Sequence, residues 1–295
     1  MIKINLSKTE IDKIKQEHFE NLYNDNKFKG KSFSLKNSLE NEISNQKNSK
    51  EFIKLLNYLN TNIKDIITGK PEELEKIITG VSSKHKILNS KIQVQNTKYG
   101  KKIREIFNYK GFNKLKNYKS YDLIKKLNIS VCLYCNRNYI FSSENINTCE
   151  LDHFYSQEKY PYLALSFYNL IPSCHTCNHK KSSKDFFISD NIHPYIESFE
   201  KDVYFNYNVQ KTDIMNKDNI TDIYISKNKL SKSTTLFTKA QKNFDNLKLN
   251  EIYSHHKDII VDIYKKKQIL NKSFIDSYSK YKYRDENGNE FSIFK

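Results

Sequence analysis

Residues 132–181 read CLYCNRNYIFSSENINTCELDHFYSQEKYPYLALSFYNLIPSCHTCNHKK and contain all five cysteines of the chain. Four of them form two C-x2-C pairs separated by 38 residues (136–173): Cys132, Cys135, Cys174 and Cys177. In a chain without an export signal, two such pairs favour one zinc ion held by four thiolates over disulfides or four unrelated buried cysteines. The intervening chain must then fold back on itself. Cys149 stands alone and is expected to be a small buried apolar residue.

The chain between the two pairs predicts a strand, a second strand and a helix. Residues 138–141 form a short β-like run, and residues 148–154 alternate as a strand that ends in Asp152 and His153. Ser173 stands where an N-cap would open a helix carrying Cys177 and Asn178. Because a zinc ion would tie the start of this helix to the first hairpin, we expect Asp152, His153 and Asn178 to lie within reach of one another.

This order of residues resembles an HNH endonuclease of the ββα-metal type with a zinc-knuckle frame. The resemblance rests on the two C-x2-C pairs, on Leu151-Asp152-His153-Phe154, on Asn169-Leu170 and on Cys177-Asn178-x2-Lys181. It implies that His153 is the general base, that Asp152 and Asn178 bind the catalytic divalent metal, and that Asn169 organises the loop that orients His153. It also implies products with 5′-phosphate and 3′-hydroxyl ends. Many members have histidine at the position of Asn178, which leaves open whether His179 assists.

The same residue types account for phosphodiester hydrolysis in chemical terms. A neutral imidazole such as that of His153 can take a proton from water at physiological pH. A carboxylate and an amide carbonyl, from Asp152 and Asn178, are hard oxygen ligands that suit Mg²⁺ or Mn²⁺. Lys180 and Lys181, near the start of the same helix, are expected to hold backbone phosphates.

The histidines also have structural interpretations. His153 alone would more often be a hydrogen-bonded structural histidine, and His175 and His179, four residues apart, are more typical of a solvated or phosphate-facing pair than of a metal site. His193 either lines the site or belongs to a turn that docks the next element. His256 falls on an apolar stripe of a predicted long helix and is expected to pack there, together with Ile252, Ile259, Ile260 and Ile263.

Charge points to a polyanionic partner. The 295 residues include 50 Lys+Arg and 34 Asp+Glu, which gives a net charge of +16 and a pI near 9.3. Nucleic acid is therefore the first partner to consider, although 47 lysines against three arginines, with 35 asparagines, also indicate the codon bias of an AT-rich genome. The chain contains no run of about 18 apolar residues, so no membrane span is predicted. Residues 1–21 contain no uninterrupted apolar segment, so no secretory signal is predicted. We expect a soluble cytoplasmic protein.

The N-terminal region, residues 1–128, is expected to be mostly helical. Ser7 and Glu10 form a capping box, residues 52–67 keep a helical period up to Gly69, and Pro71 opens a helix that should end at Gly80. Residues 121–127 predict a last helix. Residues 32–48 have little periodicity and are expected to be a loop, and residues 84–118 carry no clear pattern.

The remaining chain divides into the nuclease core, residues 129–195, and an α+β region, residues 196–295. In the latter, residues 203–209 alternate as a strand that Ile223 and Ile225 would pair with, and helices broken near Asn250 and Asn271 follow before a turn and a terminal strand. The predicted fold class is α+β and mostly helical, with a central ββα core stapled by zinc and helical extensions on both sides.

The position of the motif in the middle of the chain is similar to the HNH effector subunits of bacterial anti-phage systems, such as the Septu-type nuclease that works beside an ATPase. This resemblance implies a DNA substrate and a regulatory protein partner such as an ATPase. A restriction enzyme for modified DNA and a mobile-element nuclease use the same core. A zinc-framed nucleic-acid-binding module without catalysis and an RNA-cleaving toxin remain alternatives, because a basic groove attracts either polymer.

Overall fold

The structure, a computed structural model, describes residues 3–24, 26–28, 31–115, 117–143, 145–199, 202–210, 214–229, 233–270, 272–278, 282–284 and 290–292. These residues belong to two compact units. The first comprises Met1–Glu200 and Lys232–Leu247, and the second comprises Lys201–Ser231 and Lys248–Lys295.

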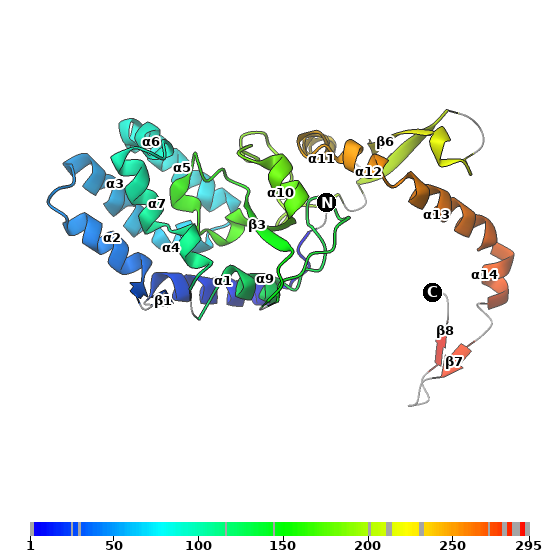
Figure 1. The fold of residues 1–295 in the computed structure, drawn as a ribbon, viewed down its shortest axis with the longest axis horizontal. Coiled ribbons are helices and arrows are strands. Elements are labelled where there is room, and N and C mark those ends of the chain that lie inside the picture. Colours follow the sequence, from blue (N-terminus) through cyan, green and yellow to red (C-terminus); the bar gives the residue numbers. More distant parts are fainter. Residues whose placement is uncertain are drawn as a thin grey trace. The chain divides into compact units, whose positions relative to one another are not determined.

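Helices build most of the first unit (Figure 1). Before the cysteine-rich region they are α1 (Lys8–Tyr23), α2 (Leu35–Ser44), α3 (Lys50–Thr61), α4 (Ile63–Thr68), α5 (Pro71–Lys84), α6 (Lys86–Gln93), α7 (Lys98–Ile106), α8 (Tyr109–Phe112) and α9 (Ser120–Leu127). A short antiparallel pair, β1 (Asn26–Phe28) and β2 (Lys31–Phe33), separates α1 from α2. Leucine, isoleucine and phenylalanine side chains from one face of each longer helix form the core between them.

Local signals predicted two helix ends correctly and missed one helix. The capping box is confirmed, since the Glu10 amide donates to Ser7 Oγ and the Ser7 amide donates to the Glu10 carboxylate. The loop expected at residues 32–48 is wrong, because Ser34 caps α2, whose Leu35 and Leu39 are fully buried. Gly69 ends α4 as predicted.

Two other helix ends differ from the prediction. The single helix expected over residues 52–67 breaks at Asn62 into α3 and α4. Helix α5 does not end at Gly80 but continues to Lys84. A Cβ atom at Gly80 would lie 1.9 Å from the Tyr58 hydroxyl oxygen, so glycine here allows the close approach of Tyr58 and does not act as a helix stop.

The cysteine-rich region forms an antiparallel hairpin followed by a helix. Strand β3 (Cys149–His153) pairs with β4 (Leu170–Cys174), and α10 (His175–Lys181) packs on both strands. The hairpin therefore differs from the predicted one, because residues 138–141 make only an isolated bridge between Val131 and Tyr139. Ser173 lies within β4, and Cys174 rather than Ser173 is the N-cap of α10.

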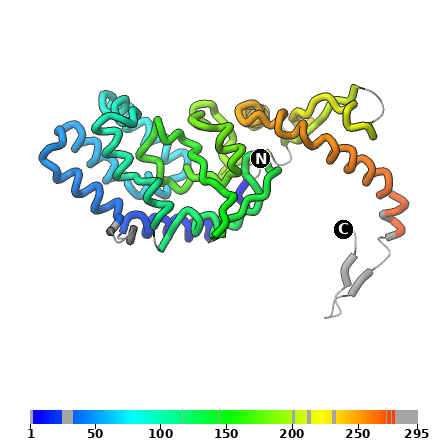
Figure 2. The backbone as a smooth tube through the Cα atoms, in the orientation of Figure 1, coloured from blue at the N-terminus to red at the C-terminus, as the bar shows by residue number. Residues whose placement is uncertain are grey.

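The N-terminal helices and the cysteine-rich region share one core. His18 on α1 bonds to Leu165, Ser166 bonds to Ile66 on α4, and the amide of Ile4 donates to the carbonyl of Pro194 (3.0 Å). Figure 2 traces the backbone of this unit, with the N-terminal helices in blue to cyan and the cysteine-rich region in green. Helix α11 (Thr234–Asn246) joins the same unit. The expected division after residue 128 thus falls inside a compact unit, whereas the expected boundary at residue 195 lies close to the end of its first segment at Glu200.

The second unit contains the predicted hairpin of β5 (Val203–Val209) and β6 (Ile220–Lys227), which pair antiparallel. Its other elements are the 3₁₀ turn η3 (Lys217–Asn219), α12 (Leu249–Ser254), α13 (Lys257–Ile269), α14 (Lys272–Tyr278), β7 (Lys282–Arg284) and β8 (Glu290–Ser292). The helix break expected near Asn250 lies at Lys248, whose φ is 55°. The position of Asn271 lies outside the described residues.

The long amphipathic helix expected around His256 is wrong. The chain breaks between α12 and α13 at His255 and His256, so the two helical stretches do not share one stripe. Ile259 and Ile263 are 49% and 62% exposed. Among the described residues, no helix has both the length and the apolar character that crossing a membrane requires.

Candidate active site

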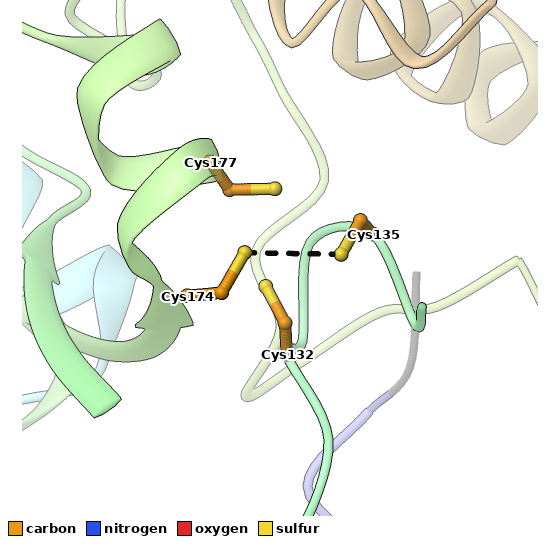
Figure 3. Close-up of side chains that lie close together, drawn as sticks. All are labelled: Cys132, Cys135, Cys174 and Cys177. Atoms are coloured by element: carbon orange, nitrogen blue, oxygen red, sulfur yellow. Dashed lines mark hydrogen bonds between the residues drawn. The ribbon is translucent and has the colours of Figure 1, made fainter. Parts of the chain in front are cut away.

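The four paired cysteines meet in one buried cluster (Figure 3). Their sulfur atoms all lie within 4.8 Å of one another, and Cys135 Sγ is 4.0 Å from Cys174 Sγ. In a tetrahedral zinc site with bonds of about 2.3 Å, sulfur atoms are about 3.8 Å apart. The predicted convergence of Cys132, Cys135, Cys174 and Cys177 is confirmed, and the cluster is compatible with a structural zinc ion.

A backbone turn at the first cysteine pair and a side-chain contact to the second pair accompany this geometry. The amide of Asn136 donates to the carbonyl of Cys132 (2.8 Å), and Asn136 adopts the left-handed conformation with φ at 50°. The side-chain amide of Asn138 donates to Cys174 Sγ (3.3 Å). The Asn138 N–H group aimed at sulfur favours the thiolate form of Cys174, because a thiolate is a stronger acceptor than a neutral thiol. Cys149 lies outside the cluster, and burial raises the pKa of its thiol to about 12.

His153 ends β3 with its ring fixed between a carbonyl and an aromatic edge. Its Nε2 lies 3.0 Å from the carbonyl oxygen of Ala164, and the Tyr109 ring packs edge-to-face at 4.5 Å between centroids. A carbonyl can only accept, so the neutral ring carries its proton on Nε2 and leaves the lone pair on Nδ1. Burial lowers the pKa of His153 to about 4, against the opposing effect of the Ala164 carbonyl. The ring is therefore neutral at pH 7.

Asn169 is fully buried and ties together the loop between β3 and β4. Its Oδ1 accepts from the Tyr155 amide (2.7 Å), its Nδ2 donates to the Leu163 carbonyl (2.8 Å), and its own carbonyl accepts from the Phe154 amide (3.0 Å). Leu163 precedes Ala164, whose carbonyl holds His153. Asn169 is thus placed to act on His153 through the loop and not by contact.

Asp152 is 3% exposed, and both of its carboxylate oxygens have partners. The Tyr134 hydroxyl donates to Oδ2 (2.6 Å), and Lys181 Nζ lies 3.2 Å from Oδ1. Burial raises the pKa of Asp152, and the Lys181 ammonium opposes that rise. A carboxylate offers about four lone-pair sites, so these two contacts leave acceptor capacity on Asp152.

Asn178 faces β3 from α10 through Glu150. Its Nδ2 donates to Glu150 Oε2 (2.6 Å), and the other oxygen of Glu150 accepts from His175 Nδ1 (2.8 Å). The carboxylate raises the pKa of the exposed His175 imidazole through this hydrogen bond. With its amide hydrogens directed to Glu150, Asn178 keeps its carbonyl oxygen for another partner.

A surface pocket of about 320 Å³ brings the central residues together. Its lining includes Asp152, His153, Asn178 and Lys181, with Ser156, Gln157, Glu158, Ser182 and Ser183. The expected proximity of the acid, the imidazole and the amide is therefore present in the structure. The Asp152 carboxylate and the Asn178 carbonyl are both hard oxygen donors, the type that Mg²⁺ and Mn²⁺ prefer.

The two lysines differ from the expectation that both hold phosphates. Lys180 is exposed, whereas Lys181 is 1% exposed and its ammonium lies on Asp152 and on the His153 carbonyl (2.5 Å). Burial and pairing make Lys181 an internal counter-ion, because a buried ammonium needs a charged partner. The burial of Lys181 and its pairing with Asp152 therefore disagree with the expectation that it holds a backbone phosphate.

Two further histidines lie away from this pocket. His179 is exposed on α10, with its ring 6.0 Å from that of His175. His193 is buried with its ring 4.3 Å from Phe154, and burial lowers its pKa to about 3. It lines a different pocket of about 400 Å³, together with Glu72, Glu75 and Lys239. His193 thus belongs to a packed turn.

Three residues of the site carried no assignment from sequence. Glu150 lies two positions before Asp152 on an alternating strand, so the period of two could have placed both on one side. Tyr109 comes from α8, and its hydroxyl donates to the Leu151 carbonyl (3.1 Å). Nothing in the local pattern around Tyr109 or Tyr134 signals a contact with the hairpin.

Comparison with known proteins gives one distant similarity. The chain is 28% identical over 96 residues to the Septu protein PtuB of Bacillus thuringiensis. The match covers 32% of this chain and 36% of the relative, so it spans about a third of each protein. No protein-family model and no solved structure matches the chain.

Proposed function

We propose that this protein is a metal-dependent endonuclease of the HNH type that hydrolyses phosphodiester bonds of DNA. The observation that carries the proposal is the pocket in which a carbonyl-anchored imidazole, His153, lies beside the Asp152 carboxylate and the Asn178 amide. A nucleic-acid-binding module would have use for the cysteine cluster and the surface lysines, but not for this combination.

His153 would act as the general base. The Ala164 carbonyl holds the Nε2 proton, so Nδ1 is the basic nitrogen, and the depressed pKa keeps it unprotonated at pH 7. When Nδ1 takes a proton from the attacking water, the Ala164 carbonyl continues to accept from Nε2 and stabilises the imidazolium. Tyr109 limits rotation of the ring by packing edge-to-face with it.

Asp152 and Asn178 would hold the divalent cation, with their carboxylate and carbonyl oxygens as ligands. A bound Mg²⁺ or Mn²⁺ supplies charge stabilisation for the phosphoryl group and the leaving 3′ oxygen. Lys180, exposed on the same helix, would contact backbone phosphate, and the net charge of +16 favours approach of a polyanion. The cysteine cluster would hold Zn²⁺ as a structural ion.

We further propose that the nuclease serves anti-phage defence together with a regulatory protein such as an ATPase. The support is the distant similarity to the Septu protein PtuB. A co-purification of the full chain with the product of a neighbouring ATPase gene tests this part. Separate elution of the two proteins at micromolar concentration would argue against it.

The experiment for the nuclease itself uses plasmid DNA, single-stranded DNA and RNA in parallel, each with Mg²⁺ or Mn²⁺. We expect nicking or cutting of DNA by the wild type and loss of cleavage in His153→Ala, with zinc content unchanged. His255→Ala, which replaces an exposed histidine of the second unit, is the matched control. Full activity in His153→Ala would reject the base assignment. Binding of nucleic acid without cleavage by the wild type and by both variants would favour a binding module. Cleavage of RNA alone would replace DNA by RNA as substrate.

A further inference from the structure

The two proposed metal ligands each share a short hydrogen bond with a residue that has no part in the proposed chemistry. Tyr134 Oη donates to Asp152 Oδ2 and Asn178 Nδ2 donates to Glu150 Oε2, both at 2.6 Å. We propose that Tyr134 and Glu150 are positioning residues of a divalent-cation site, which hold Asp152 and Asn178 in the orientation that presents oxygen to the pocket. This inference rests on the proposed function, because it takes Asp152 and Asn178 as the ligands.

Glu150 determines which end of the Asn178 amide can face a cation. Residues 150 and 152 lie on the same side of β3, the side on which α10 packs. A carboxylate only accepts, so the Asn178 NH₂ group must point to Glu150 and the carbonyl oxygen must point elsewhere. Without Glu150 the amide could turn about its broad terminal torsion and offer hydrogens, which repel a cation.

Tyr134 and Lys181 together fix the plane of the Asp152 carboxylate. The Tyr134 side chain is fully buried and packs on Phe186 with 5.6 Å between ring centroids. Its hydroxyl takes one carboxylate oxygen while Lys181 takes the other, so rotation of the group would break two contacts. The remaining lone pairs of Asp152 then have a fixed direction.

The position of Tyr134 also connects the cysteine cluster to the acid. Tyr134 lies between Cys132 and Cys135, and all three side chains are buried. An ion that holds both sulfur atoms would therefore restrict the backbone on each side of Tyr134. The cluster acts on Asp152 through one hydroxyl group, in addition to tying α10 to the first knuckle.

His175 provides a comparison within the same cluster. It bonds to the second oxygen of Glu150, yet its side chain is 78% exposed. An exposed pair of this kind contributes little, because water competes for both groups. Removing His175 should leave the bond between Glu150 and Asn178 in place.

The test measures Mn²⁺ binding to the full zinc-loaded chain by electron paramagnetic resonance, which reports free Mn²⁺ without any need for cleavage. The variants are Tyr134→Phe, Glu150→Ala and Glu150→Gln, with Tyr139→Phe and His175→Ala as controls. Tyr139 is 80% exposed and lies in the same segment as Tyr134. Outer-shell partners of metal ligands typically contribute tenfold or more to affinity, so we expect Tyr134→Phe and Glu150→Ala to weaken Mn²⁺ binding by about tenfold.

Glu150→Gln should bind Mn²⁺ more tightly than Glu150→Ala, because the glutamine carbonyl can still accept from Asn178. The two controls should stay within about twofold of the wild type. Raising the Mn²⁺ concentration should restore cleavage in the weakened variants, which a damaged fold would not allow. Zinc content and thermal unfolding of each variant are measured alongside.

Equal Mn²⁺ affinity in the wild type, Tyr134→Phe and Glu150→Ala would overturn the inference, as would a wild type that binds no Mn²⁺ at millimolar concentration. If Tyr134→Phe loses zinc, the order of Glu150→Ala, Glu150→Gln and His175→Ala decides instead. The expected order of affinities in a protein that cleaves no nucleic acid would support the positioning roles and reject the proposed function.

Discussion

The imidazole of His18 on α1 donates a hydrogen bond of 2.8 Å to the carbonyl of Leu165, in the loop between β3 and β4. Because Nε2 carries the proton, Nδ1 accepts from the Tyr118 hydroxyl (3.1 Å), and the ring is 0% exposed. Leu165 follows Ala164, whose carbonyl anchors His153. The N-terminal helix thus supports the loop that orients the proposed base.

This arrangement predicts acid sensitivity of the fold. Burial lowers the pKa of His18 to about 4, below the ordinary value of 6.5. Above pH 6.5 the ring is neutral in both states, so its contribution to stability is fully present. As the pH falls from 6.5 to 4, only the unfolded chain takes up the proton, and the free energy of unfolding should fall by about 3 kcal/mol from this residue.

His18→Gln is the variant that checks this expectation. It should be less stable than the wild type at pH 7.5, and its free energy of unfolding should fall less steeply between pH 6.5 and 4.5. Urea unfolding at several pH values measures both quantities. His255→Ala, an exposed histidine, should keep the wild-type slope. Parallel pH curves for His18→Gln and the wild type would contradict the assignment of the proton uptake to His18.

Zinc removal should unfold the cysteine-rich region. Without the metal, the four thiolates repel one another. The free energy of zinc binding, which closes a loop of 38 residues (136–173), is also lost. Cys174→Ser should therefore lower the zinc content below one per chain and reduce the melting temperature. Atomic absorption and thermal unfolding with and without a chelator measure these effects.

Cys149 provides the matched control for the zinc prediction. It faces Cys174 across the β3–β4 register and is equally buried, but its sulfur is not part of the cluster. Cys149→Ala should keep one zinc per chain and lose only the packing of a small apolar group. Equal zinc loss in both variants would mean that general damage to the hairpin, and not ligand removal, causes the effect.

Sequence predicted the cysteine cluster because each C-x2-C pair carries its own geometry within one turn. It also predicted the proximity of Asp152, His153 and Asn178, which follows once the two pairs meet. The pairing of β3 with β4 was missed, since β4 is buried on both sides and contains Pro172, so it lacks alternation and reads as a loop.

Contacts made by distant helices could not be predicted in the same way. Tyr109 reaches His153 from α8, and His18 reaches Leu165 from α1, through packing that no local period records. The burial of Lys181 was missed for a related reason. A lysine after C-x2-C-N has the pattern of a surface residue, and only the position of Asp152 beneath α10 explains its place in the core.

The buried pair of Lys181 and Asp152 predicts a large effect of removing one charge. Lys181→Met should leave the Asp152 carboxylate buried with Tyr134 alone, and loss of one partner of a buried pair costs about 3–5 kcal/mol. Urea unfolding measures the loss. The adjacent exposed Lys180→Met should change stability by less than about 0.5 kcal/mol. Adding Asp152→Asn to Lys181→Met should recover part of the lost free energy of unfolding. If the double variant loses more free energy of unfolding than the two single variants lose in sum, the pairing is contradicted.

Lys180 should affect DNA binding where Lys181 affects stability. Each phosphate contact that an ammonium makes releases a condensed counterion. The slope of log K against log salt is negative, and removing one contact on duplex DNA makes it less steep by about 0.9. Lys180→Ala should therefore weaken binding most at low salt and show a shallower salt dependence in fluorescence anisotropy, measured without divalent metal to prevent cleavage. Lys126→Ala, which removes a lysine already paired with Glu17 at 2.9 Å, is the control and should keep the wild-type slope. An unchanged slope in Lys180→Ala would remove Lys180 from the phosphate contacts, and a wild-type affinity that does not vary with salt would reject lysine–phosphate binding altogether.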